Sequence, residues 1–200
     1  MDFDTVVVGF LGVNCYVIPV VDDDAVYIVD PGASAAEIAE KAKSFGLGKY
    51  KIVFTHAHID HIGGINGLER ELPLDSTYLH PNDRPLFESP ANALPPTMPP
   101  LASTPATSAE LDTSAFSAIH TPGHTPGGVC FHFPEEKILF SGDTLFNGSI
   151  GRTDLPGGDM DALISSIENK LMALPDDTRV FPGHGPPTTI GDERKHNPFL

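Results

Sequence analysis

Metal-binding side chains are concentrated in one short stretch of this chain. Residues His56, His58, Asp60 and His61 fall within six positions, directly after the apolar run Tyr50–Phe54. That run reads as a buried strand, so the donors lie on the loop where the strand ends. Imidazole nitrogen and carboxylate oxygen are the usual donors for zinc and related divalent metals. Donors so close together are rarely kept for packing, because each would need its own buried hydrogen-bond partner. The stretch therefore predicts a metal site at a strand end.

Three later strand-like runs repeat this pattern, each ending in a donor bounded by glycine. The donors are His124 after Phe116–His120, Asp143 after Ile138–Phe140, and His184 after Arg179–Phe181. In layered α/β folds the strand ends at one edge of the sheets share a crevice, where ligands collect. The glycines let the backbone approach a metal closely. Together with the first loop these runs supply donors enough for two metals with one shared ligand.

The chemistry of the donors suggests how they divide. We assign His56, His58 and His124 to one metal and Asp60, His61 and His184 to the other. Asp143 bridges, because a carboxylate has two oxygens to give and an imidazole cannot span two ions. Two metals about 3.5–4 Å apart can hold a water between them and lower its pKa enough to yield hydroxide near neutral pH. Asp60 could also take or pass a proton. Zinc is the expected metal, and iron or manganese would suit the same donors.

Length and charge exclude several classes of protein. Two hundred residues favour a single domain over residues 1–200. The chain has 27 acidic against 12 basic residues and no cluster of Lys and Arg, so a nucleic-acid partner is not expected. No apolar run reaches the ~18 residues of a membrane span, and the stretch Val6–Val21 lacks a positive leader. We expect a cytoplasmic protein without a membrane partner, in which Cys15 and Cys130 are reduced core residues. The sequence does not indicate an oligomeric state.

Hydrophobic periodicity predicts a mixed α/β chain. The expected strands are Val6–Gly9, Val13–Val20, Ala25–Val29, Tyr50–Phe54, Thr77–His80, Ala115–Ile119, Val129–Phe133, Lys137–Phe140 and Thr178–Phe181. The expected helices run from a capping box at Ser34 to about Phe45, near Gly64–Leu72, and over Asp161–Ala173. Prolines between 81 and 105 indicate a linker or a cover loop, and we expect a loop inserted at about 81–112. This order predicts two mixed sheets packed together and flanked by helices.

These motifs resemble those of a known family. The pattern His-x-His-x-Asp-His, followed by Pro-Gly-His-Thr, Ser-Gly-Asp and Pro-Gly-His-Gly, is similar to the metallo-β-lactamase superfamily, whose fold is a four-layer αβ/βα sandwich with a dinuclear site at one edge. Within it the chain most resembles short forms of glyoxalase II (hydroxyacylglutathione hydrolase). The closer match rests on the segments Gly142–Phe146, Gly148–Asp154, Pro182–Gly185 and Asn197–Phe199.

The resemblance implies a zinc-dependent thioester hydrolase acting on an acyl-glutathione such as S-lactoylglutathione, with a metal-bridging hydroxide as nucleophile. Arg152 occupies the place of a basic residue that contacts glutathione. Asp154 stands where the family has a tyrosine, and the chain ends at Leu200 without the helical glutathione-binding domain of full-length glyoxalase II. A smaller thioester, another ester or a lactone is therefore an alternative substrate.

Other assignments stay open. A persulfide dioxygenase with a single iron shares the fold and a Gly-Arg-Thr-Asp segment like Gly151–Asp154, and metal analysis would distinguish the two. A β-lactamase, a nuclease and a non-catalytic scaffold are less favoured. Asp30 either accepts a hydrogen bond from a metal-binding histidine or caps its own turn. The apolar side chains of the Pro-rich stretch, among them Phe87 and Met98, either line the acyl pocket or anchor the loop.

Overall fold

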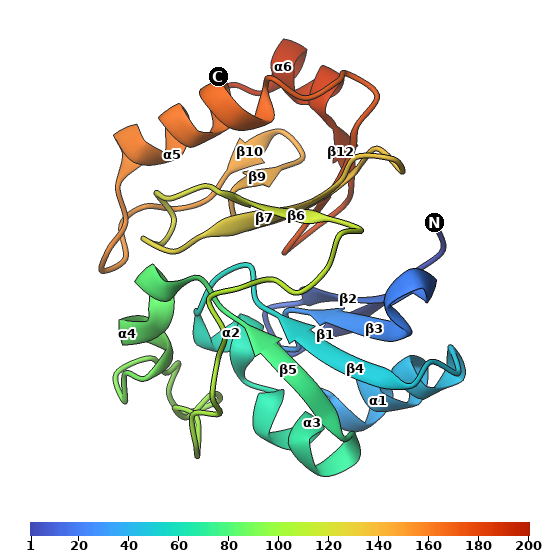
Figure 1. Cartoon of the computed structure of the whole chain (residues 1–200). Helices are drawn as coiled ribbons and strands as arrows, with labels where there is room; N and C mark the ends of the chain where they lie inside the picture. Colours follow the sequence, from blue (N-terminus) through green and yellow to red (C-terminus); the bar gives the residue numbers. More distant parts are fainter. The chain divides into compact units, whose positions relative to one another are not determined.

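The computed structural model describes residues 1–200 and divides into two compact units, Met1–Asp112 and Thr113–Leu200. Each unit contains one five-stranded mixed sheet with helices of its own (Figure 1). The two mixed sheets and the flanking helices agree with the α/β class expected from the sequence. The single domain over residues 1–200 stays a prediction.

The sheet of unit 1 has the strand order β1-β2-β3-β4-β5. Its strands are β1 (Asp4–Val8), β2 (Val13–Val20), β3 (Ala25–Val29), β4 (Lys49–Val53) and β5 (Leu74–Tyr78). Strands β1 to β3 pair antiparallel, whereas β3, β4 and β5 run parallel. The carboxyl ends of these three strands therefore meet at one edge, with β4 between the other two. The bounds expected for β2 and β3 are confirmed. Strand β5 starts earlier than expected, because Leu74 already pairs with Tyr50.

Helices α1 (Ala35–Ser44) and α3 (Ile65–Glu71) pack beside each other on this sheet, and the short α2 (Ile59–Ile62) follows the predicted metal loop. Their apolar residues, such as Ile38 and Leu68, share a core with side chains of the strands. A one-turn 3-10 helix, η1 (Val21–Asp23), precedes β3. The predicted helix after Ser34 is confirmed, but its capping box is wrong. Ser34 has a left-handed φ of 53° and makes no side-chain cap bond.

The Pro-rich stretch belongs to unit 1. It begins with η2 (Pro81–Asp83) and the single turn α4 (Arg84–Phe87). It later runs beside β5, where the Ser108 N–H donates to the Thr77 carbonyl at 2.7 Å. Phe87 is buried with its ring 5.8 Å from that of Phe54. Leu86, Met98 and Leu101 also pack on the core of this unit. Of the two alternatives for these apolar side chains, anchoring of the loop is therefore the one that the contacts of unit 1 support.

The sheet of unit 2 has the strand order β12-β11-β8-β7-β6. Its strands are β6 (Ser117–His120), β7 (Val129–Phe133), β8 (Ile138–Gly142), β11 (Arg179–Pro182) and β12 (Thr188–Thr189), and β9 (Leu145–Phe146) with β10 (Ser149–Ile150) forms a separate hairpin. The expected hairpin between β7 and β8 is confirmed by the pair of Phe133 with Ile138. Strands β8 and β11 run parallel, while β7 is antiparallel to both β6 and β8. The carboxyl ends of β6, β8 and β11 therefore share one edge.

One layer of helix covers this second sheet. Helix α5 (Met160–Ser166) continues into a π-helical turn, η3 (Ile167–Leu171), and together they confirm the helix expected over Asp161–Ala173. Leu163, Ile167 and Leu171 are fully buried in a core that includes Leu139 and Val180 of the sheet. The C-terminal helix α6 (Ile190–His196) was not predicted.

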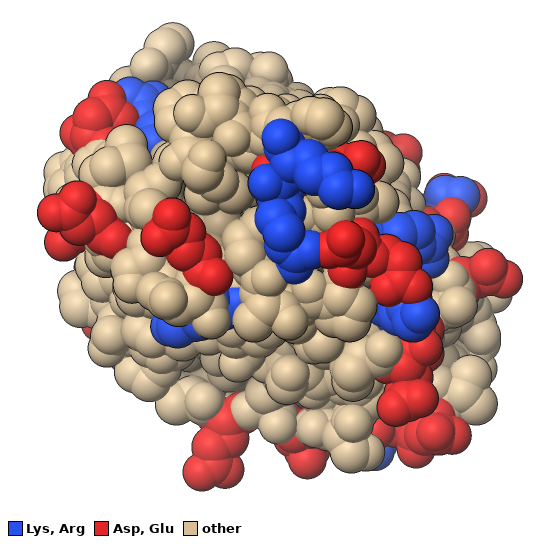
Figure 2. All heavy atoms as spheres, turned by 90° about the horizontal axis from the view of Figure 1, so that it is seen from above, with Lys and Arg blue, Asp and Glu red and all other residues tan.

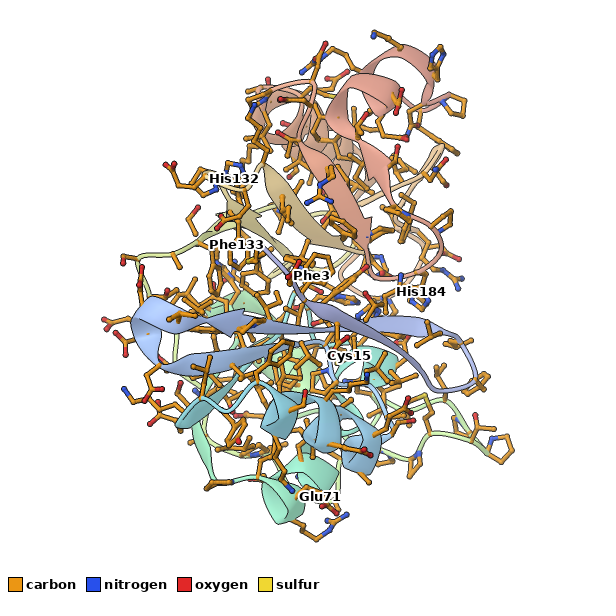
Figure 3. The ribbon with its side chains drawn as sticks, turned by 90° about the vertical axis from the view of Figure 1, so that its right-hand side faces the viewer. Phe3, Cys15, Glu71, His132, Phe133 and His184 are labelled. Carbon is orange, nitrogen blue, oxygen red and sulfur yellow. The ribbon has the colours of Figure 1, made fainter.

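The cysteines are buried, as expected, and charged side chains of both signs lie on the surface. On the face drawn in Figure 2, most Lys and Arg side chains lie beside Asp or Glu, and acidic groups are spread over the rest. Cys15, labelled in Figure 3, and Cys130 are both buried free thiols. Burial raises the pKa of the Cys130 thiol to about 11 and that of Cys15 well above its usual range. None of the helices is both long and apolar enough to cross a membrane.

Candidate metal centre

The predicted metal loop lies at the carboxyl end of β4, between its two parallel neighbours. The rings of His56 and His58 are 4.9 Å apart, and those of His56 and His61 are 4.1 Å apart. The fourth side chain, Asp60, places Oδ2 3.8 Å from His61 Nε2. His56 and His61 are buried, whereas His58 and Asp60 are half-buried. Unit 1 therefore brings all four of its predicted ligands together.

Asp30, at the end of β3, organises this loop. Its Oδ1 accepts from the Thr55 N–H at 2.8 Å, and its Oδ2 accepts from the Thr55 hydroxyl at 2.5 Å. Oδ2 also lies 2.9 Å from His61 Nδ1. A carboxylate can only accept, so His61 Nδ1 carries the proton. Thr55 donates its single hydroxyl hydrogen to Asp30, so the contact of 3.1 Å between its oxygen and His56 Nδ1 makes that nitrogen a donor as well.

A proton on Nδ1 leaves the lone pair of Nε2 available for a metal in both histidines. Asp30 accepts a hydrogen bond from His61, a predicted metal ligand, which agrees with the first of the two roles considered for it. The backbone here is equally constrained. A Cβ on Gly32, two residues after Asp30, would lie 1.6 Å from the Asp60 carbonyl oxygen. Only glycine allows the α2 turn to approach β3 this closely.

The three predicted ligands of unit 2 also lie together, at the carboxyl ends of β6, β8 and β11. Asp143 Oδ2 is 3.7 Å from His124 Nε2 and 3.6 Å from His184 Nε2. One carboxylate oxygen therefore lies between two imidazoles, and the bridging role of Asp143 stays a prediction. The position of His132 provides a contrast, because it lies at the opposite end of the sheet from His184 (Figure 3).

Arg152 contributes to this cluster through its backbone. Its carbonyl oxygen is 2.7 Å from His124 Nδ1, which fixes the proton of that histidine on Nδ1. Its guanidinium makes two bonds of 2.7 Å to the Asp154 carboxylate. This pairing lowers the pKa of Asp154 to about 2 and raises that of Arg152. The substrate-binding role of Arg152 stays a prediction, and its side chain would have to share its charge with Asp154.

Glycine is required beside Asp143. An ideal Cβ on Gly151 would lie 2.0 Å from the Asp143 carbonyl oxygen and 3.2 Å from His124 Cβ. The β9–β10 hairpin that precedes Gly151 therefore rests directly on the backbone of the aspartate. Any larger residue would displace Asp143.

The donors fit divalent cations. Nitrogen and oxygen ligands of one tetrahedral zinc, bound at about 2.0–2.2 Å, lie about 3.3–3.6 Å from each other. The separations of 3.6, 3.7 and 3.8 Å between imidazole nitrogen and carboxylate oxygen are close to that range. They are much longer than the ~2.8 Å of a charge-assisted hydrogen bond. The division of the seven residues between two metals joins donors of both units, and it stays a prediction.

Sequence reasoning missed two residues that touch the metal loop, Asp83 and Asn92. Asp83 Oδ2 accepts from the Ala57 N–H at 3.0 Å, and Asn92 Nδ2 donates to the Ala57 carbonyl at 2.7 Å. A signal existed for the first of them. Asp83 lies on η2 five residues after β5, whereas Asp30 directly follows β3, and parallel neighbours of β4 deliver their carboxyl ends to the same edge. Nothing in the Pro-rich sequence singled out Asn92.

Comparison with known proteins agrees with this architecture. Residues 8–184 match the family model described as the metallo-beta-lactamase superfamily. A hydroxyacylglutathione hydrolase, GloC, from Haemophilus influenzae is 39% identical over 188 residues, which cover 90% of this chain and 89% of the relative. The crystal structure of the BLEG-1 B3 metallo-beta-lactamase is 40% identical with a TM-score of 0.88, covering 100% of this chain and 99% of that one. TTHA1623 in a di-iron-bound form is also 40% identical, with a TM-score of 0.87 and coverage of 98% and 100%. These likenesses confirm the expected fold class.

Proposed function

This chain belongs to the metallo-β-lactamase superfamily and is a metal-dependent hydrolase, and we propose that it cleaves a small acyl thioester. The proposal assigns His56, His58 and His124 to one divalent metal, Asp60, His61 and His184 to the second, and Asp143 to both. When bound, the two cations would activate a water as nucleophile and polarise the carbonyl under attack.

One observation carries the metal assignment: the oxygen atoms that lie next to Nδ1 of the histidines. His56, His61 and His124 each direct Nδ1 at an oxygen that fixes a proton there. Those oxygens belong to Thr55, Asp30 and the Arg152 backbone. All three therefore have the same tautomer. Nε2 of His61 and of His124 also lies 3.7–3.8 Å from a carboxylate oxygen, which is the arrangement expected of metal ligands. Histidines that merely filled a core would not share this arrangement.

Hydrolysis of a thioester also needs a group that accepts and donates protons. Asp60 is half-buried and sits at the start of α2, where its carboxylate can reach solvent. We assign to it the transfer of a proton from the attacking water toward the departing thiolate. His61, whose Nδ1 is held by Asp30, keeps its position during that transfer.

The thioester rests on the similarity to GloC, a hydroxyacylglutathione hydrolase that aligns with nearly the whole chain. Our proposal for the thiol part of the substrate rests on the Arg152 guanidinium. This group is paired in two places with Asp154, so it presents little free positive charge to a glutathione carboxylate. We therefore propose that acyl-glutathione is accepted together with smaller acyl thiols.

The test combines metal analysis with turnover. The purified protein is loaded with zinc, dialysed and analysed for metal per chain, and thiol release is followed with acyl-glutathione, acyl-CoA and a small acyl thiol. We expect close to two zinc ions per chain and turnover of the glutathione and small thioesters. Asp143→Ala should lose most of the metal and all turnover, whereas His132→Ala, the matched histidine at the other end of the sheet, should keep both. Wild-type metal content in Asp143→Ala would refute the bridging role.

A second candidate is β-lactam hydrolysis, which the similarity to a B3 metallo-β-lactamase favours. Both reactions add water to an acyl carbonyl and expel a leaving group, so one site could serve either. A chromogenic cephalosporin in the same panel separates them, because faster turnover of the cephalosporin than of every thioester would reject our proposal. One iron per chain with oxygen uptake on glutathione persulfide would instead identify a dioxygenase.

A further inference from the structure

The peptide groups of Ala57 lie between the first two metal-loop histidines and need partners of their own. Ala57 is fully buried, and residues 54–58 belong to no strand or helix. Alternate side chains of an extended chain point to the same side, so His56 and His58 face one point only if the backbone stays extended here. His58 is extended, with φ −63° and ψ 144°. An extended buried segment outside a sheet has no neighbouring strand to pair its N–H and C=O groups, and leaving them unpaired costs free energy.

Two side chains of the Pro-rich stretch pair these groups. The Ala57 N–H donates to Asp83 Oδ2 at 3.0 Å, and the Ala57 carbonyl accepts from Asn92 Nδ2 at 2.7 Å. Asp83 is fully buried and Asn92 nearly so. Asn92 also donates to the Leu86 carbonyl at 3.2 Å, which fixes its amide relative to α4. Both polar atoms of Ala57 are therefore held by residues that are themselves held in place.

The position of Asp83 mirrors that of Asp30. Strands β3 and β5 flank β4, and each ends in a segment that carries a buried aspartate. Asp30 holds the loop at Thr55, and Asp83 holds it at Ala57, two residues later. Asp30, which follows β3, and Asp83, which ends η2, thus accept hydrogen bonds from the two N–H groups on either side of His56.

We propose that Asp83 and Asn92 are positioning residues that keep His56 and His58 in metal-binding geometry, so that the 81–112 segment acts as a clamp on the metal loop. Neither residue is assigned as a ligand. The clamp rests on the metal-binding part of the proposed function, but it does not depend on which ester the protein hydrolyses.

The test compares variants that open the clamp with one that loosens the same segment elsewhere. Asn92→Leu keeps the volume but removes the donor, and Asp83→Ala removes the acceptor. Asp83→Asn retains an amide oxygen that can still accept from Ala57. The matched control is Asn66→Ala. Asn66 on α3 binds Ser103 of the same segment through contacts of 3.0 and 3.2 Å, and it is neither a proposed ligand nor a partner of Ala57.

Two readouts separate positioning from general stability: the rate at which zinc is transferred to a colorimetric chelator, and the thermal midpoint of the metal-free and zinc-loaded forms. We expect Asn92→Leu and Asp83→Ala to release zinc about tenfold faster, as for other residues that orient metal ligands, and to lose part of the zinc-induced rise in midpoint. Asp83→Asn should lie closer to wild type. Asn66→Ala should lower both midpoints equally and release zinc at the wild-type rate.

Wild-type zinc release in both Asn92→Leu and Asp83→Ala would overturn the clamp, and so would equally fast release from Asn66→Ala. If Asp83→Ala does not fold, the comparison of zinc release between Asn92→Leu and Asn66→Ala still tests the clamp. A wild-type protein that binds zinc but leaves every thioester intact would refute the proposed substrate only, because both readouts measure metal binding.

Discussion

Asp30 offers the sharpest test of how the metal loop works. Its φ is 50°, in the left-handed region where Asn is tolerated as well as Asp, so Asp30→Asn changes the chemistry without straining the backbone. In the variant one of the two acceptor oxygens becomes an NH₂ donor. Thr55 N–H cannot reverse its role, so the amide oxygen is expected to stay with it, and the NH₂ group then faces the Thr55 hydroxyl and His61 Nδ1.

The expected result is a change of tautomer. The Thr55 hydroxyl can rotate, but His61 can accept from the new donor only by moving its proton to Nε2, the nitrogen that we assign to the metal. Residues that orient metal ligands typically contribute 10–100-fold to metal affinity. That corresponds to about 1.4–2.7 kcal/mol. The metal-free protein should lose about 1 kcal/mol for each of the three hydrogen bonds to the charged carboxylate that becomes a neutral one.

The measurement is the thermal midpoint with and without saturating zinc, together with competition against a chelator. In a chain of this length 1 kcal/mol shifts the midpoint by about 2–4 °C, so the zinc-loaded form should fall about 3–11 °C further than the metal-free form. Asp24→Asn is the matched control. Asp24 precedes β3 as Asp30 follows it, has a φ of 49° and accepts from the Gly48 N–H at 3.0 Å. Wild-type zinc affinity in Asp30→Asn would refute the tautomer argument.

Three further outcomes are expected. Gly151→Ala should lose zinc because its Cβ would lie 2.0 Å from the Asp143 carbonyl oxygen, and metal content per chain at the wild-type level would contradict this close approach. Cys130, with its pKa raised to about 11, should react with a thiol reagent at pH 8 only after denaturation, and labelling of the native protein would show that its burial is wrong. The pKa of Asp154 is lowered from 3.8 to about 2, so its pairing with Arg152 contributes fully above pH 3.8 and is lost as the pH falls toward 2. NMR titration of the Asp154 carboxyl carbon checks this, and Arg152→Gln should return its pKa to about 3.8.

The sequence predicted the strands and the ligand loops well, for a physical reason. Parallel strands are buried on both faces and read as continuous apolar runs, such as Ala25–Val29, so their ends can be located within a residue or two. A donor placed directly after such a run must lie at the sheet edge. Asp143, directly after β8, follows this rule, and His124 and His184 lie within a few residues of the ends of β6 and β11.

Other elements carried no readable signal. Strands β9, β10 and β12 are two residues long, too short for a period-two pattern to appear. The helix over Ala35–Ser44 was predicted from a capping box at Ser34, but the hydroxyl of Ser34 does not cap it, because a left-handed φ turns that side chain away from the first turn. Capping boxes are defined by the conformation of the cap residue, which the sequence does not specify.

The residues that hold the site were hidden for a different reason. A ligand is recognised by its side-chain type, but Asp83 and Asn92 act on the peptide groups of Ala57, and Arg152 acts on His124 through its own carbonyl. Backbone partners have no residue signature, and they become visible only when the strand order is known.

The burial of Asp83 has an energetic consequence. The carboxylate of Asp83 is removed from water in unit 1, which is costly unless nearby groups balance its charge. A divalent cation bound to the adjacent loop would add to that balance, so metal should raise the stability of this edge of the sheet more than that of its far end. Amide hydrogen exchange would show this as protection gained at Ala57 on adding zinc, with none gained at Gly48.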